Sequence, residues 1–314
     1  MLIGHQKQWN FLKRKFELNQ LSHAYLFSGT EEIGKRTFAL EFVKLIMSEN
    51  ANKEEKCQSC KLIEKGGHPD LLVISPKNDS EIQISKIREV QQFLKLKPYY
   101  SPFKAVIIDQ AEKMGKDAQS CFLKTLEEPK GQTILILISS KPEMLLPTIL
   151  SRCQMLKFFI VGLSEIKNYL IENKLPPKKA EMLANVSDGK PGRAIKFLLE
   201  PDKIEKEKKI LDKILAICDS DLALKFQYVK NLEAPNFNNI IELFKRYFRQ
   251  LLFFKIGINN FIDFNYFPPP SEKMKSYSLT KIKEIIRLAD LIDFRITTTN
   301  ANPKLALEVL LLEI

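Results

Sequence analysis

The sequence lacks any long hydrophobic segment. None of its apolar runs reaches the ~18 consecutive residues that a membrane-spanning helix requires. The first residues, MLIGHQKQWNFLKRK, carry Lys7, Lys13 and Arg14 where a secretory signal peptide needs its apolar stretch. We therefore expect a cytoplasmic protein with no membrane partner.

Cysteine is also scarce. The chain of 314 residues has five cysteines, an odd number, scattered at positions 57, 60, 121, 153 and 218. This pattern does not suit a disulfide framework, and it agrees with a reducing compartment. We interpret Cys121 and Cys153 as packed side chains without chemistry.

Charge is abundant but not balanced. With 45% hydrophobic and 28% charged residues, the composition is that of a globular protein and excludes a disordered chain. Lys and Arg number 49 against 38 Asp and Glu, a net charge of +11 that favours anionic partners: nucleic acid, nucleotides or an acidic protein face. A free-standing DNA-binding protein is one alternative, but the sequence has no helix-turn-helix or zinc-finger pattern and no internal repeat.

Two periodicities alternate in the first half of the chain. Short apolar runs typical of buried strands lie at residues 23–29, 71–74, 105–108 and 133–138. Between them, apolar residues at helical spacing lie at 34–44, 84–96 and 117–126. Strands that alternate with helices predict a parallel sheet covered on both faces.

The second half has no strand pattern after Ser164. Helical patterns cover eight stretches, at residues 165–173, 178–186, 194–199, 203–217, 220–231, 237–255, 279–294 and 303–312. We therefore predict an α/β domain over residues 1–158, a small helical domain over 159–203 and a larger all-helical domain over 204–314.

A phosphate-binding loop is indicated between the first strand and the first helix. Gly29, Gly34 and Lys35 match a pattern in which glycines permit a tight loop and the lysine reaches the outer phosphates. The pattern departs at Arg36, where a serine or threonine would bind Mg²⁺, and Thr37 stands one position later. The alternative is an ordinary strand–helix turn that contains a lysine.

A second strand supports the nucleotide interpretation. The apolar run at 105–108 ends in Asp109, the position where an NTPase holds its Mg²⁺. Gln110 follows, where a hydrolytic enzyme carries a glutamate that polarises the attacking water. Because the side-chain amide of Gln110 has almost no basicity, it cannot take a proton from the attacking water. Loop and strand together predict ATP or ADP that is bound weakly or not at all, and that is not hydrolysed.

Three later segments form a more specific signature. They are Lys124–Pro129 (KTLEEP), the strand that ends in Ser139 and Ser140, and Leu146–Cys153 (LPTILSRC). With them the sequence resembles the clamp-loader branch of the AAA+ proteins, in the form that serves bacterial DNA polymerase III. The resemblance extends from about residue 3 to the end and includes Gly189–Ala194 (GKPGRA).

The resemblance implies a RecA-like AAA+ domain, a helical lid and an all-α collar that packs with other subunits in a hetero-pentamer. The implied partners are the motor subunits (gamma/tau), the delta subunit, the sliding clamp and, through the complex, primer–template DNA. Within the pentamer it implies the fixed member, or stator, whose own nucleotide site is degenerate and which lacks ATPase activity.

The resemblance also assigns roles to two arginines. Arg152 matches the SRC arginine that reaches into the ATP site of a neighbouring subunit, where it acts in trans. Arg193, in GKPGRA, matches the lid arginine that contacts a nucleotide bound in the same subunit.

A zinc module is the remaining family feature to weigh. Cys57 and Cys60 match the last two of the four cysteines that members of this family commonly use. No cysteine lies between residues 1 and 56, and we interpret His68 as part of an HPD turn. Because a structural zinc site needs four protein ligands, we expect a remnant loop and no metal.

An autonomous ATPase, such as the motor subunit of the same loader, is the leading alternative. Arg36 and Gln110 argue against it, because both departures fall on positions needed for Mg²⁺ or for water.

Overall fold

The chain folds into two compact units. The computed structural model describes residues 2–48, 58–76, 80–129, 131–232, 237–258, 266–299 and 301–314. One unit comprises Met1–Leu175 and Asp188–Arg193, and the other comprises Pro176–Ser187 and Ala194–Ile314. The three-domain division at residues 158 and 203 stays a prediction. Within the described residues, no helix combines the length and the apolar character that crossing a membrane requires.

A five-stranded parallel sheet forms the centre of the first unit. Its strands are β1 (Ala24–Ser28), β2 (Leu71–Ile74), β3 (Lys104–Ile108), β4 (Thr133–Ser139) and β5 (Gln154–Lys157). They lie in the order β2-β3-β4-β1-β5, and all neighbouring pairs are parallel. The predicted parallel sheet is confirmed. The sequence analysis missed β5 because this edge strand is half-exposed and has no continuous apolar run.

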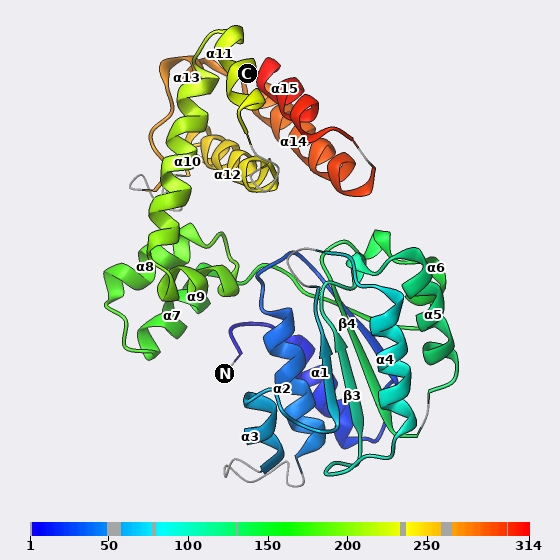
Figure 1. Cartoon of the computed structure of the whole chain (residues 1–314). Helices are drawn as coiled ribbons and strands as arrows, with labels where there is room; N and C mark the ends of the chain where they lie inside the picture. Colours follow the sequence, from blue (N-terminus) through cyan, green and yellow to red (C-terminus); the bar gives the residue numbers. More distant parts are fainter. Residues whose placement is uncertain are drawn as a thin grey trace. The chain divides into compact units, whose positions relative to one another are not determined.

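Helices cover both faces of the sheet (Figure 1). One face carries α1 (Gln6–Glu17), α2 (Lys35–Met47) and α3 (Gln58–Glu64), and the other carries α4 (Ile84–Lys95), α5 (Lys116–Glu127) and α6 (Pro147–Leu150). Alternate residues of each strand supply the two cores. Tyr25 and Phe27 of β1 pack with α2, whereas Ala24 and Leu26 pack with α4 and α5. Both faces of β1, β3 and β4 are buried, which explains why these strands have largely apolar sequences.

Shorter elements complete the first unit. They are η1 (Ala111–Lys113), η2 (Pro142–Met144) and α7 (Leu163–Glu172). The sharp turn after α6 leads directly into β5. The loop after β1 and the segment after β3 both leave the sheet at the edge where its strands end, and this edge positions the predicted nucleotide residues.

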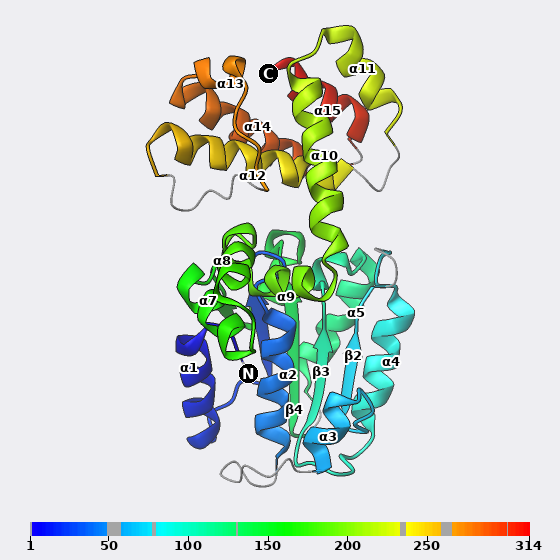
Figure 2. The ribbon, with the colours of Figure 1, turned by 90° about the vertical axis from the view of Figure 1, so that its left-hand side faces the viewer.

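The second unit is helical. Its helices are α8 (Pro177–Val186), α10 (Asp202–Cys218), α11 (Leu222–Lys230), α12 (Phe237–Lys255), α13 (Glu272–Ser276), α14 (Leu279–Thr298) and α15 (Pro303–Leu312), and α9 (Pro191–Leu199) begins in the first unit and continues here. α12 packs along α14, and α15 packs on both α11 and α14 (Figure 2). From Leu163 onward the described residues contain no strand, as predicted. The expected fold class, an α/β domain followed by helical domains, is confirmed.

The aromatic stripe of α12 forms much of the core of the second unit. Phe244, Tyr247, Phe248 and Leu251 are buried, and the rings of Phe244 and Phe248 stack with centroids 4.7 Å apart. Packing therefore explains the aromatic residues of this helix. Full burial of one such side chain contributes about 1.5–3 kcal/mol to folding.

Candidate functional site: a closed phosphate-binding loop and an exposed arginine

The predicted phosphate-binding loop connects β1 to α2. Gly34 is the N-cap of α2 and has φ +93°, a conformation that glycine adopts at little cost. Gly29 is required for a different reason, because a Cβ there would lie 2.4 Å from the backbone oxygen of Phe158. One glycine allows the turn, and the other allows the loop to lie against the residue that follows β5.

The lysine of the loop is turned inward. Lys35 is 7% exposed, and its Nζ donates hydrogen bonds to the carbonyl oxygens of Gly29 and, at 2.7 Å, Thr30. Burial lowers the pKa of Lys35 to about 8, although Glu112 and the other nearby carboxylates act to raise it. The ammonium that would meet a phosphate is therefore bonded to the loop's own backbone.

The neighbouring arginine contacts the acid of the second strand. Nη1 of Arg36 lies 3.7 Å from Oδ2 of Asp109, so the structure brings these two predicted residues together. Burial raises the pKa of Asp109, and the charge of Arg36 acts in the opposite direction. Thr37 is exposed, one residue further into α2. A cation thus stands beside the carboxylate that would hold Mg²⁺, and this set of residues does not fit that metal.

Glu112 is a site residue that the sequence analysis missed. Its Oε1 accepts hydrogen bonds from the backbone N–H of Ser140 at 3.0 Å and from the hydroxyl of Ser140 at 2.5 Å. Gln110, with φ +51°, has a buried side-chain oxygen that accepts no hydrogen bond among the described residues. The signal available in the sequence was the position of Glu112, three residues after Asp109 in the same segment.

The GKPGRA segment lies against the same loop. The N–H of Gly192 donates to the carbonyl oxygen of Glu32 at 2.7 Å, and a Cβ on Gly192 would lie 2.6 Å from that oxygen. The N–H of Val161 donates to the carbonyl of Gly189 at 2.8 Å. Arg193, near the start of α9, is buried and 3% exposed. The structure therefore brings Arg193 to the neighbourhood of the predicted nucleotide residues.

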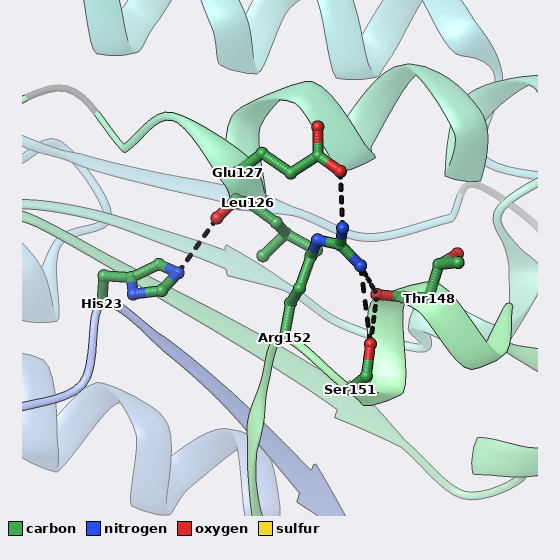
Figure 3. Close-up of polar contacts among 6 residues, drawn as sticks. All are labelled: His23, Leu126, Glu127, Thr148, Ser151 and Arg152. Carbon is green, nitrogen blue, oxygen red and sulfur yellow. Dashed lines mark hydrogen bonds and ion pairs between the residues drawn. The ribbon is translucent and has the colours of Figure 1, made fainter.

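Arg152 is placed elsewhere, and it is exposed. It follows α6, and its side chain is 37% exposed. Figure 3 shows its guanidinium between the ends of two helices: Nη2 lies 2.7 Å from Oε1 of Glu127, and Nη1 donates to the carbonyl of Thr148 at 3.0 Å. The guanidinium is thus held by two contacts and is still partly exposed to solvent.

The register of the sheet separates Arg152 from the phosphate-binding loop. Tyr25 pairs with Gln154 and Ser28 pairs with Lys157 in the parallel β1–β5 ladder. Arg152 precedes this ladder, whereas Gly29 follows it. Four residues of parallel strand span about 13 Å. Arg152 therefore lies at the edge of the sheet where its strands begin, and the loop lies at the opposite edge, where its strands end. This arginine does not serve the nucleotide site of its own chain.

The cysteines carry no recognisable chemistry in the described residues. Cys57 lies outside them, so the zinc prediction remains untested. No cluster of three or more metal-ligating side chains occurs where the chain is described. Burial raises the pKa of the Cys153 thiol to about 12, which keeps it protonated and unreactive.

Comparison with known proteins adds a family and named relatives. Residues 4–161, just over half of the chain, match the family model described as "DNA polymerase III, delta subunit". The chain is 38% identical over 179 residues to the DNA polymerase III subunit delta' of Bacillus subtilis, covering 56% of this chain and 54% of that protein. It is 34% identical over 168 residues to subunit delta' of Pseudomonas aeruginosa, covering 52% and 51%.

Another relative carries a different name. The chain is 34% identical over 167 residues to DNA polymerase III subunit tau/gamma of Haemophilus influenzae, covering 52% of this chain and 24% of that protein. The matches to both delta' proteins span about half the length of those relatives.

Proposed function

This chain belongs to the family described as "DNA polymerase III, delta subunit", and on that premise we propose that it acts as the delta-prime, or stator, subunit of a clamp loader. In this role it does not hydrolyse ATP. It supplies Arg152 to the ATP site of a neighbouring subunit and so helps to load a sliding clamp onto primed DNA. The site of action is the cytoplasm.

One observation carries the proposal. At one edge of the sheet Lys35 is buried and bonded to carbonyls of its own loop, and at the opposite edge the side chain of Arg152 is 37% exposed. The relatives named delta' match at 34–38% identity and support this assignment, while a tau/gamma protein matches at 34%. The contacts of Lys35, Arg36 and Asp109 support the stator.

The chemistry proposed for Arg152 follows from its guanidinium. This group is always charged, and it presents a rigid fork of donors that suits phosphate oxygens. Placed against the γ-phosphate of a neighbour's ATP, it stabilises the negative charge that develops during transfer, an effect worth about 10³ or more in rate. The neighbour's own residues bind the metal and position the water.

The remaining expectations belong to the same proposal. The partners are the motor (gamma/tau) and delta subunits of a hetero-pentamer, the sliding clamp, and primer–template DNA reached through the complex. ATP or ADP binds weakly or not at all between the loop and Arg193. The helical collar at residues 204–314 joins the ring, and the remnant of the zinc module holds no metal.

The decisive experiment reconstitutes the loader with Arg152→Ala protein, the motor and delta subunits, clamp and primed DNA. We expect an intact complex in which DNA-stimulated hydrolysis at the one ATP site that Arg152 reaches falls by about 10³, with clamp loading reduced in parallel. The matched control is Arg14→Ala, which removes an exposed arginine from α1 of the same unit. An intact complex with both activities at the wild-type level would refute the stator mechanism.

An autonomous ATPase is the second candidate, and one observation favours it. Gly29, Gly34 and Lys35 preserve the backbone path and the lysine of a phosphate-binding loop. This candidate requires Lys35 to leave its internal partners and Arg36 to leave Asp109 when a nucleotide arrives. ATPase measurements on the isolated chain separate the two candidates.

A further inference from the structure

Glu127 contacts the guanidinium of Arg152. Glu127 is the last residue of α5, and its Oε1 lies 2.7 Å from Nη2 of Arg152 (Figure 3). The two residues are 25 positions apart in the sequence, since 152 − 127 = 25, and they come from different helix ends. The side chain of Glu127 is 48% exposed, so the pair lies at the surface and not in the core.

Two backbone contacts fix the position of this pair. On the Arg152 side, Nη1 donates to the carbonyl of Thr148 in α6 at 3.0 Å. On the Glu127 side, a ring nitrogen of His23 lies 3.1 Å from the carbonyl oxygen of Leu126, which ties the end of α5 to the residue before β1. Helix C-termini carry partial negative charge, which favours a cation placed there. The end of α5, which carries Glu127, is thus tied to the residue before β1.

We propose that Glu127 is a positioning residue for Arg152, holding the guanidinium in the orientation in which it meets the neighbour's phosphate. This inference rests on the trans-acting role of Arg152 proposed above. A guanidinium has five N–H donors. It can therefore keep its bonds to Glu127 and Thr148 while it presents other N–H groups to phosphate oxygens.

Glu127 could either position Arg152 or compete with the phosphate for its guanidinium, and the exposure of the pair decides between the two. A carboxylate that competed with the phosphate would need to bind the arginine tightly, but surface ion pairs contribute little to stability. Restricting the arginine side chain, in contrast, lowers the conformational entropy that is lost when the guanidinium engages a phosphate. Glu127 therefore accelerates the neighbour's reaction by preorganising Arg152.

The test uses the reconstituted loader with full-length variants of this chain. For Glu127→Gln we expect the kcat of the DNA-stimulated ATPase to fall by about twofold to fivefold, the rate equivalent of losing one exposed ion pair. The KM for ATP should not change, because the neighbour's own residues bind the nucleotide. Glu127→Asp, which keeps the charge, should recover part of the loss.

Glu128→Gln is the matched control, since it removes the adjacent exposed carboxylate of the same LEEP segment. We expect wild-type kcat for this variant. The double variant Glu127→Gln/Arg152→Ala provides a readout that a merely structural role would not give. If Glu127 acts through Arg152, the double variant should be no slower than Arg152→Ala alone.

The outcomes distinguish this inference from the proposed function. A large loss in Arg152→Ala with wild-type rates in Glu127→Gln overturns only the inference. Wild-type rates in Arg152→Ala overturn the proposed function and the inference with it. A faster Glu127→Gln variant means that the carboxylate competes with the phosphate, and a further loss in the double variant means that it acts independently of Arg152. Either result refutes positioning.

Discussion

The two edges of the parallel sheet use their cations in opposite ways. At the edge where the strands end, Lys35 is buried against carbonyls of its own loop and Arg36 lies beside Asp109. At the edge where the strands begin, the guanidinium of Arg152 contacts Glu127 and the side chain is 37% exposed. The sheet keeps these edges about 13 Å apart. One site can therefore lose its chemistry while the other retains an accessible arginine.

The comparison also explains why the loop still contains its glycines. β1 lies between β4 and β5, so the backbone of the loop is fixed by the centre of the sheet. Gly29 packs against the carbonyl of Phe158, immediately after β5, with no room for a Cβ. Packing alone thus requires Gly29, whether or not a nucleotide binds. A retained motif residue is not by itself a sign of retained activity.

The contrast between the two ends of the sheet would fail if the chain hydrolysed ATP at its own phosphate-binding loop. We expect the isolated chain to be at least about 10⁴-fold slower than a motor subunit assayed in parallel. Arg36 replaces a Mg²⁺ ligand and Gln110 replaces the catalytic carboxylate, and each such loss typically costs about 10² or more. Turnover near about 1 per second that is abolished by Lys35→Ala would contradict this expectation.

The pH dependence of stability sharpens the description of Lys35. The folded chain releases the Lys35 proton near pH 8, whereas the ordinary lysine pKa is 10.5. Between these values the unfolded chain binds more protons, so the unfolding free energy should rise with pH, by at most about 3 kcal/mol. This contribution is present above pH 10.5 and is lost as the pH falls through about 8.

Urea unfolding of wild type and Lys35→Met from about pH 7 to 11 measures this effect as the difference between the two curves. Lys61→Met, at an exposed position of α3, is the control and should follow the wild type. Parallel curves for wild type and Lys35→Met would mean that Lys35 is open to solvent, and the contrast with Arg152 would disappear.

The smallest expected effect tests whether packing preserves the loop. Gly29→Ala should lower the unfolding free energy by about 2 kcal/mol, because the new Cβ meets a backbone oxygen that cannot move easily. Gly67→Ala is the control: nothing lies within 4 Å of a Cβ there, and the change should stay within about 0.5 kcal/mol. Equal stability of the two variants in thermal or urea unfolding would contradict the packing explanation.

The strands were predictable where burial is complete on both faces. β1, β3 and β4 are buried at every residue, and their sequences are unbroken apolar runs. β5 was missed because its sequence, QMLK, has polar residues at both ends, whereas β2, also at the sheet edge, was found because LLVI is an unbroken apolar run. Among the α-helices, α1, α3, α6 and α13 were not predicted. The long amphipathic helices of the second unit were found at nearly their observed bounds.

The site was predictable only as a set of separate residues. Spacing identified Gly29, Lys35 and Asp109, because a loop after a strand and an acid after a strand are local patterns. Glu112 carried no such pattern, and Glu127 lay within KTLEEP without a role assigned to it. Their roles come from contacts with Ser140 and Arg152, 28 and 25 positions further along the chain, which only a folded chain can make.

The sequence by itself determined the residue types at each edge: which glycines permit the loop, which metal ligand is replaced by Arg36, and that an arginine stands in SRC. The type of each residue and the spacing of apolar residues decide these points, and both can be seen in consecutive residues of the sequence. The tertiary structure alone decided where the charges go. It turned Lys35 onto the loop, brought Arg36 to Asp109, and left Arg152 exposed beside Glu127. The physical reason is that burial and charge pairing depend on distances between segments that are remote in sequence.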